Sequence, residues 1–246
     1  MNIALVVHDL QDQPGHSLYA KTLANGLGLR HRVTVFANRC ERLADARWDT
    51  QHVRASRRSA QACIQSFPLG MRAHAAALSG YDIQHSQGYC GGKPNVVTAH
   101  ICVAAYLDSL RSANLRNRLS LQLMARTEAR FYRRYHGRVI AVSQKIANEL
   151  KQYYGVQTPI DVIPHGVDAA RFRNGTHESE RGAVRSQLQL KDNQTLALYV
   201  GDLTKSHTHL KALAAAARRP AGVALHLQSK SSPASQLVWK CSPSRA

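Results

Sequence analysis

The chain has 246 residues, of which 44% are hydrophobic, and this is enough to bury a core in one large domain or two modest ones. No apolar run reaches the roughly 18 residues that a membrane-spanning helix needs, and no basic segment precedes the first apolar run, so neither a membrane span nor a signal peptide is expected. The formal net charge of +18 at pH 7 indicates an anionic partner, which nucleic acid, a phospholipid surface or a phosphorylated substrate would each satisfy.

Cysteine and histidine usage argues against disulfides and against a metal site. The 5 cysteines contain no C-x-x-C pair, and the 13 histidines contain no H-E-x-x-H pattern. Free thiols fit a reducing compartment. We therefore expect a cytoplasmic protein without a metal ion.

Short apolar runs predict strands suited to a buried parallel sheet. They lie at Ile3–Val7, Val33–Phe36, Ile83–His85, Val96–Ala99, Val139–Val142, Ile160–Ile163, Leu196–Val200 and Val223–Leu227. Helical patterns lie between many of them, most clearly over Ser17–Leu29, Leu115–Tyr135 and Gln144–Tyr154. This alternation predicts an α/β fold with a doubly wound parallel sheet.

The loop after the first predicted strand, His8–His16, contains Gly15 and opens onto a helix N-terminus. Unpaired backbone N–H groups and the positive end of the helix dipole suit a phosphate or a sugar hydroxyl there, so Gly15 and His16 are candidate binding residues. The loop lacks the G-x-G-x-x-G pattern, so nicotinamide-type dinucleotide binding is not supported. A plain turn eased by Gly15 is the alternative interpretation.

His100 follows the predicted strand Val96–Ala99, at the end where α/β sheets place groups that face a ligand. A neutral imidazole at this place can accept a proton or form a hydrogen bond with a sugar hydroxyl. A structural histidine at a strand end is the alternative.

Residues 111–138 hold eight arginines and a single acid, Glu128. This distribution predicts one basic helix rather than a uniformly basic surface. As an amphipathic segment, the helix is a candidate for peripheral contact with anionic lipid at the inner membrane face. A solvated helix face is the alternative.

Ser143 precedes the helical pattern Gln144–Tyr154, where its hydroxyl is a natural N-cap, and Gly155 is expected to end the helix. The next strand leads into His165 and Gly166. We expect the strand end to project His165 toward a ligand crevice, and Gly166 to allow a turn that a β-carbon would obstruct. Ser143, His165 and Gly166 are therefore candidate binding residues, with capping as the simpler role for Ser143.

Composition divides the chain into four segments. Residues 1–173 are expected to form a first Rossmann-like domain, and residues 174–192, which are poor in large apolar side chains, a polar linker. Residues 193–227 predict part of a second Rossmann-like domain. Residues 228–246, rich in serine and without a repeating period, are expected to be an irregular tail, with a surface extension as the alternative.

Two further candidate binding residues lie in the predicted second domain. Gly201 follows the strand Leu196–Val200, and Lys205 stands at the start of the next helical stretch. Glycine lets a ligand approach the backbone, and lysine offers an ammonium group to a diphosphate. A turn glycine and a solvated lysine are the alternative.

The segment VIAVSQKIANELKQYYGV, followed by IDVIPHGVDAARF and LALYVGDL, resembles the V-x-x-S…VIPNGVD-x-x-x-F pattern and the strand–glycine loop of family-four-type retaining glycosyltransferases. That resemblance, which extends over most of residues 1–227, implies the GT-B architecture, with an acceptor-binding N-terminal half and a C-terminal half that binds a nucleotide-sugar. It also implies that Gly15 approaches the donor phosphate, that His100 lines the sugar pocket as the catalytic candidate, and that Lys205 contacts the diphosphate. Such enzymes normally need no metal, because basic residues and a helix N-terminus neutralise the leaving group.

The chain departs from this pattern at informative positions. His165 stands where asparagine is usual, and Asp202 stands where arginine is usual, an acid that would repel the diphosphate unless it points away. No glutamate follows Glu180, so the paired-glutamate motif that holds the donor sugar in this family cannot be present. We therefore expect a truncated C-terminal domain with an incomplete donor site.

Taken together, these patterns predict a glycosyltransferase-family protein that moves a sugar from a nucleotide-sugar, its co-substrate rather than a cofactor, to a saccharide or lipid-linked acceptor. Because the donor site is expected to be incomplete, a catalytically silent truncated remnant or an acceptor-binding module stays open. A basic nucleic-acid-binding protein is a third alternative. It is disfavoured because no recognisable binding module is present and only 6% of residues are aromatic, so no nucleic-acid partner is expected.

Overall fold

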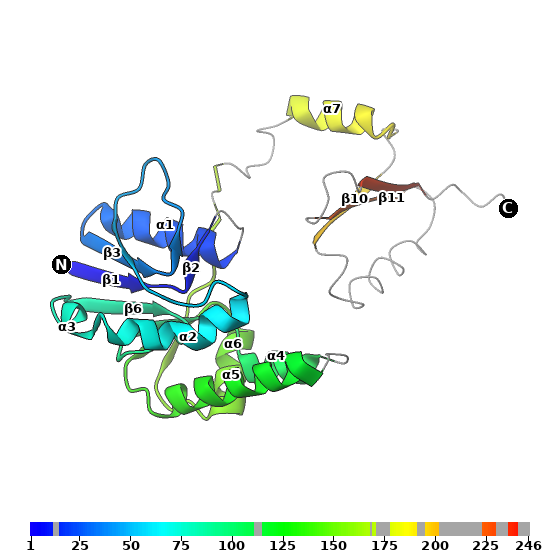
Figure 1. Cartoon of the computed structure of the whole chain (residues 1–246). Coiled ribbons are helices and arrows are strands. Elements are labelled where there is room, and N and C mark those ends of the chain that lie inside the picture. The colour runs from blue at the N-terminus through cyan, green and yellow to red at the C-terminus, as the bar shows by residue number, and fades with distance from the viewer. Residues whose placement is uncertain are drawn as a thin grey trace. The chain divides into compact units, whose positions relative to one another are not determined.

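A computed structural model describes residues 1–11, 15–110, 115–167, 169–170, 178–190, 195–201, 223–229 and 236–240. The chain divides into two compact units, Met1–Gly166 and Val167–Ala246 (Figure 1). Each unit is described by itself.

The first unit is built on a seven-stranded sheet in which every neighbouring pair of strands is parallel. Across the sheet the order is β5-β3-β1-β6-β7-β8-β9. The strands are β1 Asn2–Val6, β3 Arg32–Ala37, β5 Asp49–His52, β6 Ile83–Gln87, β7 Val96–Ala99, β8 Arg138–Ala141 and β9 Ile160–Val162. A separate two-residue parallel pair joins β2 Asp9–Leu10 to β4 Arg39–Cys40.

Helices connect these strands and cover the sheet. They are α1 His16–Gly28, α2 Ala60–Arg72, α3 Ala75–Leu78, α4 Val103–Ser109, α5 Leu115–Arg133 and α6 Gln144–Tyr154. No helix within the described residues is long and apolar enough to cross a membrane.

Successive residues of β1 show why the sheet carries helices on both faces. Leu5 packs in one buried cluster with Ala20 of α1, and its neighbour Val6 packs in another cluster with Phe67 of α2. Neighbouring side chains of a strand point to opposite faces, so α1 and α2 lie on opposite sides of the sheet (Figure 1). The predicted doubly wound parallel sheet is confirmed.

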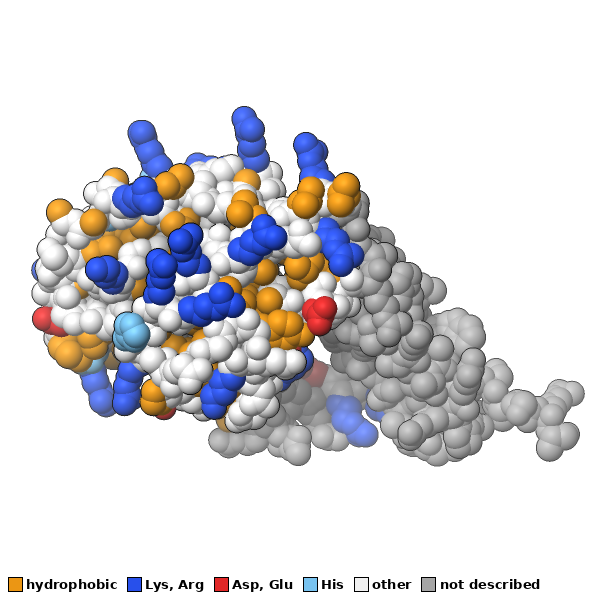
Figure 2. Space-filling model, turned by 90° about the horizontal axis from the view of Figure 1, so that it is seen from below, with side chains coloured by type: hydrophobic (Ala, Val, Ile, Leu, Met, Phe, Trp, Pro, Cys, Tyr) orange, Lys and Arg blue, Asp and Glu red, His pale blue; other side chains and the backbone are white. Residues whose placement is uncertain are grey.

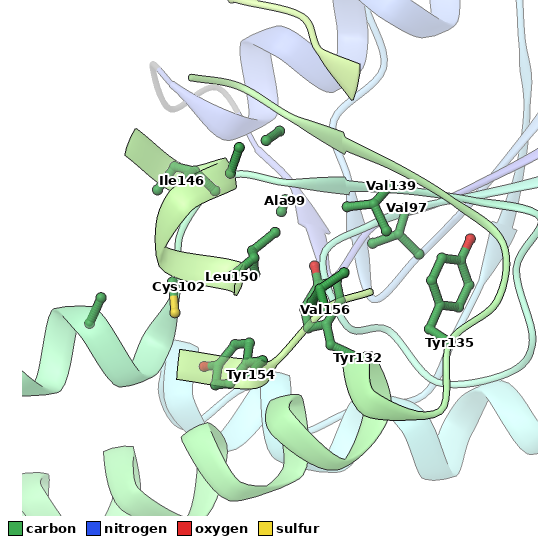
Figure 3. Close-up of a cluster of buried hydrophobic side chains, with 13 residues drawn as sticks. Val97, Ala99, Cys102, Tyr132, Tyr135, Val139, Ile146, Leu150, Tyr154 and Val156 are labelled. Carbon is green, nitrogen blue, oxygen red and sulfur yellow. The ribbon is translucent and has the colours of Figure 1, made fainter. Parts of the chain in front are cut away.

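A further core joins β7 and β8 to helices α5 and α6 (Figure 3). Its labelled members are Val97, Ala99, Cys102, Tyr132, Tyr135, Val139, Ile146, Leu150, Tyr154 and Val156. Helix α6 supplies Leu150 and Tyr154 at a spacing of four residues, the period of one helix face. The cluster anchors the chain on both sides of the β7 carboxyl end, which carries His100.

All eight predicted strands are present with bounds that agree to within two residues, whereas several other elements were not predicted. Strand β5 consists of four exposed residues with the sequence DTQH, so it has no apolar run to reveal it. Helix α2 contains Pro68 and Gly70, which weaken a helical pattern. Its other local signals are the Ser59 cap and the buried residues Cys63, Phe67 and Met71, which recur every four positions.

The described residues of the second unit include helix α7 Glu178–Gln187 and a three-stranded sheet. The strands are β10 Thr195–Gly201, β11 Val223–Ser229 and β12 Gln236–Lys240, in the order β10-β11-β12. Strand β10 pairs with β11 in parallel, and β12 pairs with β11 in antiparallel orientation.

This unit corrects two expectations. The segment 174–192, expected to be a polar linker, contains α7, whose polar residues include several good helix formers. The segment 228–246, expected to be irregular, contains β12, because the run QLVWK finds hydrogen-bond partners along β11. The helical stretch expected after Lys205 lies outside the described residues.

Candidate functional site

The order of the strands creates a crevice at the centre of the first unit. Strand β1 has β3 on one side and β6 on the other, so the connections that leave these strands diverge at their carboxyl ends. Ligands of open α/β sheets bind at such a switch point, outside the carboxyl ends of the strands. His8 follows β1 by two residues, and Gln87 ends β6.

A cavity of about 640 Å³ opens at this switch point. Its walls come from the ends of β1, β6 and β7, from the start of α1 and from helices α2 and α5. The polar and titratable lining residues include His8, Asp9, His16, Gln87, His100 and Glu128. The predicted candidates His100 and His16 therefore share one cavity.

Helix α1 begins at the edge of this cavity without a side-chain cap. Gly15, the residue at its N-cap position, has a φ of 98°, which disfavours any residue with a β-carbon. The first turn carries no acid, while His16 and Ser17 line the cavity. Among the described residues, no side chain caps the first N–H groups of α1, and the positive end of its dipole lies at the cavity.

His100 forms hydrogen bonds through both ring nitrogens. Its Nε2 lies 2.9 Å from Oε1 of Gln87, and its Nδ1 lies 3.2 Å from Nε2 of His165. The ring of His16 packs edge-on against His100 with centroids 4.5 Å apart. Tyr19 stacks on His165 at 4.6 Å with an interplanar angle of 27°. His165 therefore reaches the predicted crevice although it follows the last strand of the sheet.

The histidines at the cavity are held neutral. Burial and, to a smaller extent, the neighbouring His16, His165 and His85 together lower the pKa of His100 to about 3. Burial likewise lowers the pKa of His8 to about 4, and it lowers the pKa of His16. Neutral imidazoles can both donate and accept hydrogen bonds, which suits the recognition of sugar hydroxyls.

Glu128 is a buried carboxyl on the α5 wall of the cavity and was not predicted as a site residue. One of its oxygens, Oε2, accepts hydrogen bonds from the Val103 N–H at 2.9 Å and from the Tyr154 hydroxyl at 2.5 Å. Burial raises the pKa of Glu128 to about 7. Since Val103 is the first residue of α4, Glu128 fixes the start of the helix that follows His100.

The remaining candidates lie elsewhere or act differently. Ser143 caps α6 by accepting a hydrogen bond from the Ile146 N–H at 3.3 Å, which is the simpler role given above, and it does not line the cavity. Gly201 ends β10 in the second unit, and Lys205 lies outside the described residues.

Gly166 requires a correction. Its φ is not in the left-handed region, and a β-carbon built on it would meet no atom within 4 Å. The expected obstruction by a β-carbon is therefore wrong. The chain leaves β9 in an exposed, open path that any residue can follow.

Three site residues were not predicted although the sequence contains a pattern that could have identified them. His8 and Gln87 occupy strand ends, so the rule that selected His100 would also have selected them. Tyr19 follows the Gly15 loop by one helical turn. Glu128 had no such pattern, because its burial depends on packing between α5, α4 and α6. Among the described residues, no group of three or more His, Cys, Asp or Glu side chains could hold a metal ion.

A parallel sheet of this order, with helices on both faces and a cavity at the switch point, defines a Rossmann-like α/β domain. Residues 15–171 match the sequence pattern of Glycosyltransferase Family 4, and the chain belongs to that family. No curated protein matches the chain.

Solved structures with the GT-B architecture resemble the chain at low sequence identity. The glycosyltransferase WaaG, involved in lipopolysaccharide biosynthesis, matches with a TM-score of 0.70 and 16% identity over 92% of this chain and 62% of its own. Anabaena Alr3699/HepE, in complex with UDP and glucose, matches with a TM-score of 0.61 and 15% identity over 92% and 60%. A glycosyltransferase from Rickettsia africae ESF-5 matches with a TM-score of 0.53 and 14% identity over 91% and 59%.

These likenesses show the fold. The chain spans about three fifths of the length of these solved structures. The first unit corresponds to the N-terminal half of the GT-B architecture, as the sequence pattern predicted.

Proposed function

We propose that this chain provides the acceptor-side half of a retaining glycosyltransferase, which moves a sugar from a nucleotide-sugar to a saccharide or lipid-linked acceptor. The observation that carries this proposal is the cavity of about 640 Å³ at the switch point, where the α1 N-terminus and a set of neutral histidines meet. The bound UDP and glucose of the Anabaena relative support a nucleotide-sugar as the donor.

Each candidate residue has a role in this proposal. His100 is the catalytic candidate, and its neutral imidazole forms a hydrogen bond with a sugar hydroxyl. Gly15 and His16 lie where the α1 N-terminus can stabilise the donor phosphate. His165 contacts the sugar beside His100. Gly201 and Lys205 are the second-unit candidates for the donor diphosphate, and Ser143 keeps its role as the N-cap of α6.

A second groove supports an acceptor that carries negative charge. It has a volume of about 580 Å³, and it shares Tyr89 and Thr127 with the walls of the cavity. Its charged lining residues are Lys93, Arg130 and Arg134, and no carboxylate lines it. An acceptor whose reacting hydroxyl lies at His100 would therefore place a phosphate or carboxylate against these cations.

The exposed face of α5 supports contact of a lipid-linked acceptor with a membrane. Leu115, Leu119 and Leu123 are 74%, 57% and 54% exposed, and they recur every four residues on one side of the helix. Arg126 and Arg130 continue this row, and none of its residues packs in the core. Figure 2 shows basic side chains interspersed with hydrophobic ones on the face seen from below. Such a surface suits the headgroup region of an anionic bilayer.

The proposal is tested on the full chain by titration with UDP-glucose, with glucose and with glucose 6-phosphate, observed through the histidine ring signals in NMR spectra. We expect the signals of His16 and His100 to shift with each ligand, and glucose 6-phosphate to bind more tightly than glucose. The variant His100→Ala should weaken glucose binding. His31→Ala should not, because His31 directly precedes β3, at the amino-terminal ends of the strands.

Transfer itself is measured with radiolabelled UDP-glucose and the same acceptors. Transfer that falls roughly a hundredfold in His100→Ala would support the catalytic role of His100. Glucose binding without transfer would identify an acceptor-binding module instead. If no ligand shifts the ring signals and no label is transferred, the proposal is wrong.

A further inference from the structure

Behind His100, a chain of hydrogen bonds runs along the carboxyl ends of β6 and β7. Gln87 Nε2 lies 3.3 Å from His85 Nε2, and the Thr98 hydroxyl lies 2.8 Å from the same nitrogen. On its other side, Gln87 Oε1 lies 2.9 Å from His100 Nε2. Gln87, His85 and Thr98 are 1%, 8% and 0% exposed. Water is therefore kept from these contacts.

The chemistry of the Gln87 amide fixes which atom donates and which accepts along this row of hydrogen bonds. An amide nitrogen only donates, so His85 Nε2 accepts from Gln87 and carries no proton, and the Thr98 hydroxyl shares its single lone pair. An amide oxygen only accepts, so His100 Nε2 carries the proton that it donates to Gln87. Neutral His100 then has no proton on Nδ1. That nitrogen accepts the hydrogen bond from His165 Nε2–H, 3.2 Å away.

His100 Nδ1 is the end of this row of hydrogen bonds that ligands can reach. His165 is exposed, and His100 itself lines the cavity at the switch point. Among the described residues, no carboxylate makes a hydrogen bond or ion pair with His100 that would favour its charged form. An acceptor nitrogen in this position is complementary to a hydroxyl, which is a hydrogen-bond donor of the same kind as His165 Nε2–H.

Building on the proposed function, we propose that Gln87 is a positioning residue, which holds His100 in the Nε2–H tautomer so that His100 Nδ1 accepts a hydrogen bond from a hydroxyl of the bound sugar. In the present structure His165 takes the place of that hydroxyl. His85 and Thr98 complete the device, because they keep the Gln87 amide from rotating. This role is separate from the candidate catalytic role of His100, since Gln87 acts only through the ring that it orients.

The tautomer is measured directly in the full chain labelled with ¹⁵N-histidine, using long-range ¹H–¹⁵N correlation spectra near neutral pH. In the unchanged protein we expect a protonated Nε2 and an unprotonated Nδ1 on His100, and the reverse on His85. Gln87→Leu should give His100 a mixture of the two tautomers. Gln87→Glu should keep Nε2 protonated and raise the pKa of His100, because a carboxylate would then accept from it. Gln84→Leu, on the same strand, should change neither the tautomer nor the pKa of His100.

Glucose titration connects the tautomer to binding. We expect Gln87→Leu to bind glucose roughly tenfold more weakly than the unchanged protein, and Gln84→Leu to bind it equally well. A protonated Nδ1 on His100 in the unchanged protein would overturn the proposal even if Gln87→Leu did not fold. So would a His100 tautomer that stays the same in a folded Gln87→Leu variant.

Failure of the proposed function looks different. In that case the tautomers of His85 and His100 are as expected, but neither glucose nor UDP-glucose shifts their signals. That outcome would show that His100 does not bind a sugar and would overturn the role of Gln87 in binding. The hydrogen bonds between His85, Gln87 and His100 would still be confirmed.

Discussion

Glu128 shows how strongly position decides the chemistry of a single residue. It is the one acid among eight arginines in residues 111–138, yet it forms no ion pair with them within the described residues. Its side chain points into the core, where the Val103 N–H and the Tyr154 hydroxyl share one of its oxygens. The carboxyl is thus a structural acceptor for the start of α4, and it is favoured there in its neutral form.

This environment predicts a pH dependence of stability. Burial raises the pKa of Glu128 from 4.5 to about 7, so the folded chain binds this proton more tightly than the unfolded chain. The stabilising effect is fully present below the unfolded pKa and is lost as the pH rises through about 7, a difference of about 3 kcal/mol. Glu128→Gln keeps an oxygen for both donors and cannot ionise. We therefore expect it to unfold at a higher urea concentration than the unchanged protein at pH 8, with a smaller difference at pH 5.

Glu128→Ala is the matching control for the hydrogen bonds. It leaves the Val103 N–H and the Tyr154 hydroxyl without their acceptor, so the free energy of unfolding should fall by about 2–4 kcal/mol at pH 5. The fall should be smaller at pH 8, because the buried carboxylate already destabilises the unchanged protein there. An equal difference between the unchanged protein and Glu128→Gln at pH 5 and pH 8 would contradict the prediction.

At the scale of elements, helix α2 depends on a close approach to the chain that follows β5. A β-carbon added to Gly70 would come within 2.1 Å of the Arg54 carbonyl oxygen and 3.0 Å of a Val53 methyl group. The same helix places Pro68 and Leu69 on the cavity wall. Gly70 therefore sets the distance between α2 and the sheet and, with it, the width of the cavity.

We predict opposite effects for alanine at two helical glycines. Gly70→Ala should lower the free energy of unfolding by about 1–3 kcal/mol, because the backbone of Arg54 must move. Gly26→Ala in α1 should raise it by about 0.5–1 kcal/mol, since no atom lies within 4 Å of the new β-carbon and the unfolded chain loses freedom. Thermal unfolding of both variants checks this pair. Equal stability of the two would show that α2 does not press on Arg54.

For the molecule as a whole, the location of the basic residues indicates which partner the net charge of +18 favours. Exposed leucines lie among exposed Arg116 and Arg118 in the N-terminal half of α5, and exposed Arg126, Arg130 and Arg133 lie in its C-terminal half. Charge spread evenly over the surface would act mainly on solubility. Charge next to apolar side chains favours binding to an anionic lipid surface.

Vesicle sedimentation tests this surface. The full chain should bind vesicles of phosphatidylcholine and phosphatidylglycerol at about 0.05 M salt, and lose most of this binding at about 0.5 M salt or with phosphatidylcholine alone. Removing two arginines with Arg130→Gln and Arg133→Gln should weaken binding roughly 30-fold, at about 1 kcal/mol for each. The matched pair Arg30→Gln and Arg32→Gln lies at the start of β3, away from α5, and should change vesicle binding little.

Two results would count against the membrane surface. Equal binding to neutral and anionic vesicles at low salt would exclude a role for the arginines. Equal loss in both double variants would mean that only total charge matters, and that α5 is a solvated helix face.

The elements that the sequence predicted well are those whose own residues carry the pattern. Strands such as Val96–Ala99 are continuous apolar runs, and α6 has both a capping serine and a left-handed Gly155. Strand β5 lacks such a pattern, and it forms because β3 offers it hydrogen-bond partners. Helix α2 has a capping serine, Ser59, and buried residues every four positions, but Pro68 and Gly70 obscure the pattern. Gly166 and the segment 228–246 were misread for a similar reason, since surroundings rather than composition decide their conformation.

The sequence by itself determined the alternation of strands and helices, the family, and the place of His100 at a strand end. Only the tertiary structure decided the order of the strands, and with it which side chains meet. His100 and His165 are 65 residues apart in the chain, yet their ring nitrogens lie 3.2 Å apart. The physical reason is that parallel strands bring their carboxyl ends to one edge of a sheet however far apart they are in sequence, so the site is assembled by strand order that no local pattern encodes.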